Sequence, residues 1–153
     1  ILMAESKAKE MNLEPLGYIK DYAYAGLHPH RMGLGPVYAT HRLLKNTGMT
    51  MKDFNLVELN EAFAAQVIGN VRAFDSKDFA KEYLNDSKAV GTLDESILNV
   101  NGGAIALGHP VGTSGARIVI TLLKELRRRN QNSGLATICV GGGQGGALAL
   151  EVN

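Results

Sequence analysis

Apolar and polar positions along the chain follow two periods, one typical of helices and one typical of strands. Helical spacing occurs in four segments, at residues 1–13, 35–48, 61–74 and about 112–129. Alternating or short apolar runs predict five strands, at residues 16–27, 55–59, 97–105, 134–143 and 145–153. In the second helical segment Pro36 stands at the start and Gly48 just past the end, where these two residue types are favoured.

Strands and helices alternate through most of the chain. This order predicts the α/β class: a mostly parallel, mixed sheet of five strands with helices on its faces, closed by an antiparallel hairpin. Residues 72–98 are rich in charge and poorly periodic, so we expect a surface excursion there, within one domain that covers residues 1–153.

Composition narrows the function classes. A chain of 153 residues can bury a core without disulfides or metals. The formal net charge of +1 gives no electrostatic reason to expect nucleic acid or an anionic membrane as a partner. No apolar run approaches the ~20 residues of a transmembrane helix, and no secretory signal is present, so we expect a soluble intracellular protein. Cys139 is the only cysteine, which excludes an intrachain disulfide and a multi-thiolate metal site.

The first helical segment lacks a start signal. No Ser, Thr, Asp or Asn precedes Ile1 to cap it, and the chain has no initiator Met. We therefore expect this helix to begin upstream, in a longer protein.

Glycine is enriched, and its positions are clustered. There are 18 glycines, and ten of them fall at 102–115 and 141–146, each cluster beside one reactive side chain, His109 or Cys139. The loops at Asn60, His109 and Cys139 each follow a predicted strand. Ligands gather at the carboxyl ends of strands in open α/β sheets, so these three loops are expected to form one site.

Several motifs have simpler interpretations. Glycines 141, 143 and 146 match G-x-G-x-x-G, but no helix or acidic residue follows them at the required distance. Ser114 and Thr113 open a predicted helix, where capping of the first turn is favoured over a nucleophilic role. Asn60 and Glu61 admit two interpretations, a helix cap with a first-turn carboxylate or an amide that holds a water.

His109 and Cys139 also stay open on local residues alone. His109 lies between Gly108 and Pro110, so its imidazole is either structural or a hydrogen-bond donor to a developing oxyanion. Cys139 ends the apolar run ATICV and is either a core residue or, beside three glycines, a thiol that transfers protons.

Three segments together carry a resemblance to a known family. NEAFA at 60–64, NGGAIALGHPVGTSGAR at 101–117 and CVGGGQGGALALE at 139–151 resemble the three signatures of the carboxyl-terminal half of thiolases. The likeness extends over essentially the whole chain. The segment around 72–98 resembles that of the 3-ketoacyl-CoA thiolases of fatty-acid oxidation. The resemblance implies one half of the duplicated thiolase architecture.

The resemblance also implies site residues. His109 and a water held by Asn60 would stabilise an enolate oxygen, Cys139 would be the acid and base, and the Gly141 amide would join an oxyanion hole. Ala62, Phe63, Gly108 and Gly142 would line the passage for CoA. No metal and no cofactor is implied, because CoA is a substrate.

Thiolases need a second, nucleophilic cysteine, and this chain has one cysteine in all. The resemblance therefore implies an amino-terminal thiolase half as partner, with the nucleophile in it, and a chain that is inactive alone. Acyl-CoA and CoA are the implied small-molecule partners. A homo-oligomer and a hydratase/dehydrogenase subunit are further expected partners, in the cytoplasm or alternatively the mitochondrial matrix. The alternatives are a non-catalytic module that binds acyl-CoA or lipid, and a ketoacyl synthase.

Overall fold

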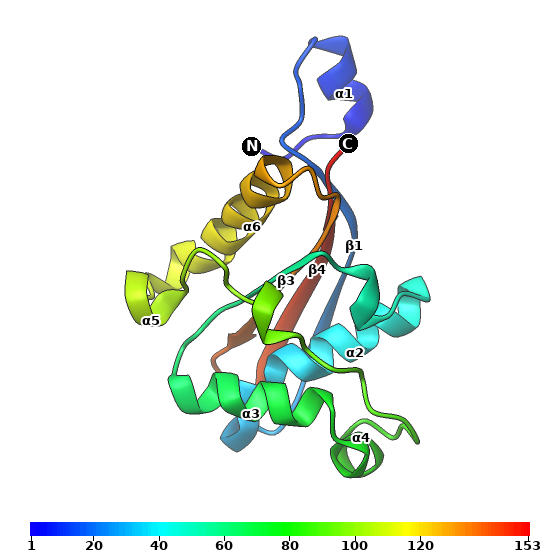
Figure 1. The fold of residues 1–153 in the computed structure, drawn as a ribbon, viewed down its shortest axis with the longest axis vertical. Coiled ribbons are helices and arrows are strands. Elements are labelled where there is room, and N and C mark those ends of the chain that lie inside the picture. Colours follow the sequence, from blue (N-terminus) through cyan, green and yellow to red (C-terminus); the bar gives the residue numbers. More distant parts are fainter.

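The computed structural model describes residues 1–153 and contains one mixed sheet with helices on both faces (Figure 1). The strands are β1 (Tyr18–Gly26), β2 (Leu56–Leu59), β3 (Ser133–Val140) and β4 (Gln144–Glu151). The α-helices are α1 (Glu5–Glu10), α2 (Gly35–Thr47), α3 (Ala64–Phe74), α4 (Lys77–Tyr83), α5 (Ala104–Leu107) and α6 (Val111–Arg128). Three 3-10 turns complete the chain, η1 (Pro29–Leu34), η2 (Met51–Asp53) and η3 (Glu95–Ile97).

The strand order is β1-β4-β3-β2. β2 and β3 are parallel, while β4 pairs antiparallel with both β3 and β1. The sheet is mixed, as predicted, but it is not mostly parallel: β4 lies between β1 and β3, so β2 with β3 is the one parallel pair among three. The α/β class and the closing antiparallel hairpin, β3 with β4, are confirmed.

The number of strands is a correction, because the structure has four and not five. In the expected fifth strand only Leu98 forms a parallel bridge, to Val57. The next residue, Asn99, has a φ of +46°, and its side chain takes the place of the next ladder bonds by pairing with the backbone of Leu59. Backbone with positive φ cannot continue a pleated strand, so the run ends there, and a short helix, α5, follows.

The sheet separates two cores, because side chains on a strand alternate between its faces. Val57, Leu135 and Ala149 belong to the larger cluster, under α2 and α3. Their chain neighbours belong to the second cluster, under α6: Leu56, Ala136 and Leu150. Helix α6 thus covers one face, and α2 with α3 covers the other (Figure 1).

Helix α2 begins in direct contact with the sheet. A Cβ on Gly145 of β4 would lie 2.0 Å from the carbonyl oxygen of Gly35, and a Cβ on Gly35 would lie 2.4 Å from the carbonyl oxygen of Gln144. Two glycines let the backbones meet. As predicted, the helix has Pro36 in its first turn and ends at Gly48 in the left-handed conformation, with φ +71°.

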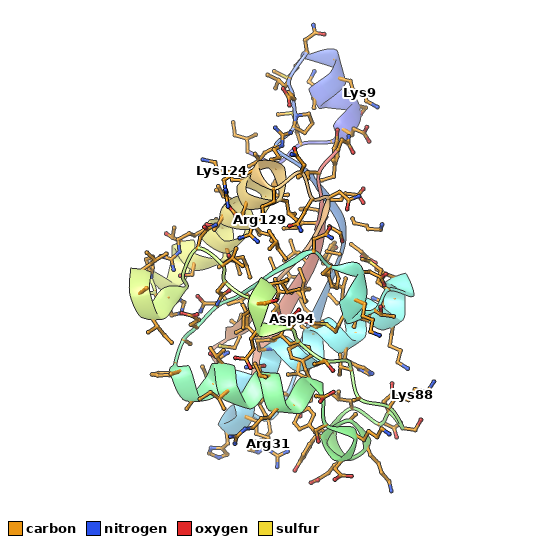
Figure 2. The ribbon with its side chains drawn as sticks, in the orientation of Figure 1. Lys9, Arg31, Lys88, Asp94, Lys124 and Arg129 are labelled. Atoms are coloured by element: carbon orange, nitrogen blue, oxygen red, sulfur yellow. The ribbon has the colours of Figure 1, made fainter.

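The segment 72–98 contains the end of α3, α4 and η3, and its inward side chains Phe74, Ala80 and Leu93 are buried. Charged side chains such as Lys9, Arg31 and Lys88 lie at the rim of the molecule (Figure 2). No helix combines the length and apolarity that crossing a bilayer requires.

Candidate functional site

Two of the expected site residues lie side by side at one edge of the sheet. The register of the parallel strands pairs Leu59 with Thr137, and the Asn60 amide donates to the Thr137 carbonyl at 3.0 Å. Asn60 therefore follows the end of β2 beside the last residues of β3, which include Cys139. The Leu98 bridge places the chain that leads to His109 on the other side of β2. The three loops thus start from adjacent positions at the carboxyl edge of the sheet (Figure 1).

Asn60 has an unused amide side chain. The residue is 1% exposed, and neither its Oδ1 nor its Nδ2 has a hydrogen-bond partner within the protein. A buried polar group without a partner costs about 1–3 kcal/mol, so a ligand or water there would be held firmly. The cap interpretation is wrong, because α3 begins at Ala64 with Phe63 as its N-cap.

Cys139 is the next-to-last residue of β3 and pairs with Gly145 across the hairpin. It is 6% exposed. Burial raises the pKa of its thiol above the ordinary value of 9.0, because a thiolate loses solvation there. At neutral pH the group is therefore a neutral thiol with a proton to donate.

His109 is exposed, and its ring is fixed from one side. Its Nδ1 is hydrogen-bonded to Oγ of Ser114 at 2.7 Å. Ser114 lies in the first turn of α6 and is fully buried. With Nδ1 engaged, Nε2 is the ring nitrogen left for a ligand.

The contact of Ser114 with His109 was not predicted from the sequence. The expected helix cap is wrong, because the N-cap of α6 is Pro110 and no side chain caps the helix. The signal was the spacing: a serine five residues after His109, in the turn after a Gly-His-Pro bend, can reach back to the ring.

The loop before His109 is held by two further features. Gly108 has φ +82° and ψ 169°, a region that only glycine populates readily. Arg117 of α6 donates from Nη2 to the Gly108 carbonyl at 2.7 Å. The bend is therefore held by the conformation of Gly108 and by the hydrogen bond from the Arg117 guanidinium.

The glycines after Cys139 serve two purposes. Gly143 and Gly145 are required by packing, since a Cβ on Gly143 would lie 2.3 Å from the Leu27 carbonyl oxygen. A Cβ on Gly141 or Gly142 would meet nothing within 4 Å, and both residues are exposed. At these two positions the fold leaves open space beside the backbone, where a ligand can approach.

A buried carboxyl lies behind these loops. Glu58 of β2 is 4% exposed, and burial raises its pKa to about 7. This value includes smaller effects of three charges: those of Glu61 and Glu125 raise the pKa, and that of Arg117 lowers it. Glu58 is thus largely protonated in mildly acidic solution, next to the arginine that holds the His109 loop.

The chain does not enclose the site. His109 makes no hydrogen bond to Asn60 or Cys139, and four apolar side chains around the loops are more than half exposed: Phe63, Ile105, Leu107 and Val111. Ala62 is half-buried beside Phe63. Two cavities of about 430 and 300 Å3 lie elsewhere and are lined by none of the expected site residues. No group of His, Cys, Asp and Glu side chains is arranged to hold a metal ion.

Comparison with known sequences and structures gives a consistent result. A family model described as the C-terminal domain of thiolase matches residues 13–152. The 3-ketoacyl-CoA thiolase of Aliivibrio fischeri (strain ATCC 700601 / ES114) is 48% identical over 99% of this chain and 35% of its own length. That of Shewanella loihica is 46% identical over the same shares. The chain spans about a third of the length of these relatives.

Two solved structures are similar to this chain over nearly its whole length. Human mitochondrial 3-ketoacyl-CoA thiolase in complex with CoA has a TM-score of 0.83 at 43% identity, over 97% of this chain and 34% of that one. The acetyl-CoA acetyltransferase of Bacillus anthracis has a TM-score of 0.80 at 42% identity, over the same shares.

Proposed function

The chain belongs to the thiolase family, and on this premise we propose that it is the carboxyl-terminal part of a 3-ketoacyl-CoA thiolase. The reaction is acyl transfer between a 3-ketoacyl-CoA and CoA, giving acetyl-CoA and a shortened acyl-CoA, or the reverse condensation. The names of the relatives support the reaction, and the CoA complex of the human enzyme supports the substrate.

One observation carries the proposal: the unpartnered, buried amide of Asn60 lies at adjacent strand ends with the buried thiol of Cys139. A group that binds an oxygen or a water and a group that transfers a proton are the two functions an enolate requires. A module that only binds acyl-CoA needs neither.

In the first half-reaction, a cysteine thiolate from an amino-terminal thiolase segment attacks the 3-keto carbon. The bond between C2 and C3 breaks, and acetyl-CoA leaves as an enolate. His109 Nε2 and a water on Asn60 donate hydrogen bonds to the enolate oxygen, and Cys139 gives its proton to the enolate carbon. The raised pKa of Cys139 supports the protonated starting form.

In the second half-reaction, the Cys139 thiolate takes the proton of the incoming CoA thiol. The CoA sulfur then attacks the acyl-cysteine thioester, and the nucleophile leaves as a thiolate, which His109 helps to stabilise. The Gly141 amide and the nucleophile's own amide hold the oxyanion of this step. The open space at Gly141 supports its role, because a Cβ there would meet no protein atom.

The pantetheine arm of CoA would pass along Ala62, Phe63, Gly108 and Gly142. The support is chemical: these residues are uncharged, Gly108 and Gly142 are exposed and without a side chain, and Phe63 presents an exposed ring.

The partner of this surface would be the amino-terminal thiolase half. The exposed apolar side chains around the site support a packing partner, because monomeric proteins rarely leave such groups clustered in solvent. A homo-oligomer and a hydratase/dehydrogenase subunit belong to the same proposal.

The test is CoA-dependent cleavage of a 3-ketoacyl-CoA by the purified chain, alone and mixed with a separately produced amino-terminal thiolase segment. We expect activity only in the mixture, lost in Cys139→Ala and in His109→Ala. Activity of the chain alone contradicts the assignment of Cys139 as acid and base. No activity in either, with CoA still bound, favours the non-catalytic module.

A further inference from the structure

The two loops that carry Asn60 and His109 are joined by a cluster of hydrogen bonds in which neither of those residues takes part. The side chain of Asn99 pairs with both backbone groups of Leu59: the Leu59 amide donates to Oδ1 and Nδ2 donates to the Leu59 carbonyl, each at 2.9 Å. Nδ2 also donates to Oε1 of Glu61 at 2.9 Å. Leu59 and Glu61 are the residues before and after Asn60.

The second oxygen of Glu61 reaches the other loop. Oε2 accepts the backbone amide of Ile105, in α5, at 3.0 Å. Ile105 lies four residues before His109. A single carboxylate thus bonds to the loop that leads to His109 and is covalently next to Asn60.

Gly103 shows how closely the two loops meet. A Cβ at this position would lie 2.2 Å from the carboxyl carbon of Glu61 and 2.4 Å from Oε2. No side chain other than hydrogen leaves room for the carboxylate, although the φ of Gly103, −116°, is ordinary. The glycine is therefore required by contact and not by conformation.

The Asn60 side chain has no partner of its own, so its direction depends on how its neighbours are held. From these contacts we infer that Glu61 is a positioning residue: with Asn99 and Gly103 it forms a clasp that sets Asn60 relative to the His109 loop. The inference rests on the proposed function for its kinetic consequence. The clasp itself is independent of it.

The first experiment uses the 15N-labelled chain with the variants Glu61→Gln and Glu61→Ala. The control is Glu10→Gln, an exposed carboxylate of α1 that pairs only with Lys7. We expect amide hydrogen exchange at Ile105 to become about ten- to hundredfold faster in Glu61→Ala, because a bond to a charged acceptor is lost. Glu61→Gln, with one acceptor oxygen left, should lie between, and the Asn60 side-chain and His109 resonances should move in both. Unchanged Asn60 and His109 resonances overturn the inference.

Gly103→Ala gives a second test from the opposite side of the same contact. It should displace the carboxylate and shift the same resonances. Because the clash is with Glu61, the double variant Glu61→Ala/Gly103→Ala should equal Glu61→Ala alone. Additive effects of the two substitutions contradict the clasp.

The kinetic arm uses the mixture with the amino-terminal thiolase segment. We expect Glu61→Gln and Glu61→Ala to lower kcat by roughly ten- to hundredfold with KM for CoA unchanged, as for a misplaced catalytic group. A raised KM with kcat retained overturns a positioning role. If the unaltered mixture is inactive, the proposed function fails, and the resonances and exchange rates decide the clasp by themselves.

Discussion

Nδ1 of His109 and Oγ of Ser114 lie 2.7 Å apart, so an exposed imidazole is fixed by a hydroxyl that is fully buried in the first turn of α6. The buried partner does not move with solvent, and it determines which ring nitrogen faces outward. The proposed enolate-binding role of His109 therefore depends on a residue that never touches the ligand.

The first prediction concerns this pair. Ser114→Ala should lower kcat in the mixture with the amino-terminal segment by about tenfold or more, because the ring loses the hydrogen bond that holds its orientation. The resonances of the His109 ring, which should shift when the ring is no longer held, check the cause. Thr113→Ala is the control, since Thr113 is exposed and makes no side-chain hydrogen bond; an equal loss in both variants contradicts the prediction.

The second prediction concerns the bend at Gly108. Its φ of +82° and ψ of 169° are strained for any side chain, so Gly108→Ala should lower the free energy of unfolding by about 1–3 kcal/mol. Gly112→Ala is the matched control with the opposite sign. Gly112 lies in α6 with open space around it, so alanine should add about 0.5–1 kcal/mol. Denaturant unfolding measures both, and equal signs contradict the prediction.

The third prediction concerns the contact of α2 with β4. Gly145→Ala would place Cβ 2.0 Å from the Gly35 carbonyl oxygen. We expect a loss of about 3 kcal/mol or more, because backbone atoms cannot yield as a side chain can. In Gly146→Ala the nearest atom is a Tyr24 ring carbon at 3.2 Å, and Tyr24 is 65% exposed. It can move, so the cost should be about 1 kcal/mol or less by thermal or denaturant unfolding.

The fourth prediction is a pH dependence. The pKa of Glu58 rises from 4.5 to about 7 on folding, so the native state binds the proton more tightly than the unfolded state. This carboxyl therefore contributes stability that is fully present below about pH 4.5 and is lost as the pH rises through about 7.

Glu58→Gln should remove this loss of stability at high pH, because the glutamine side chain does not ionise. The variant and the wild type should be equally stable near pH 4, and the variant should be more stable by up to roughly 3 kcal/mol above pH 7. Asp86, whose pKa is lowered by its hydrogen bonds, titrates alike in both proteins, so its contribution cancels in the difference between their stabilities. A constant difference between pH 4 and 8 contradicts the prediction.

The fifth prediction concerns the reactivity of Cys139. Burial holds the pKa of its thiol above 9.0, so alkylation by iodoacetamide should be slow at pH 7 and should reach half its maximal rate only above pH 9. The same chain in denaturant should titrate at a lower pH, near the ordinary thiol pKa of 9.0. A midpoint below pH 8 in the folded chain would show a stabilised thiolate and contradict Cys139 as a resting acid.

Much of the architecture could be predicted from the chain. Alternating and helical apolar periods locate β1, β3, β4, α2 and α6 because each element must bury one face. Gly48 marks the end of α2 by its left-handed φ. The prediction that three loops follow strand ends holds for Asn60, whereas Cys139 lies inside β3 and His109 follows the short helix α5. The pairing of β2 with β3 places Asn60 beside the last residues of β3.

The rest depends on contacts between residues distant in sequence. The fifth strand is missing because the Asn99 side chain, 40 residues from Leu59, occupies the backbone groups that a strand would pair. From the sequence alone Ser114 is expected to cap a helix. In the structure the bend at Pro110 turns His109 back, and the Ser114 hydroxyl bonds to its ring instead. Nothing in the neighbouring sequence requires glycine at 103 or 145. The requirement comes from close contacts in the fold, of Gly103 with the Glu61 carboxylate and of Gly145 with the Gly35 carbonyl. The sequence by itself thus determined the α/β class, most of the longer elements and the family resemblance, because periodicity and motifs are local. Only the tertiary structure decided which groups are buried, paired or left free at the site, because those states depend on what folding brings alongside.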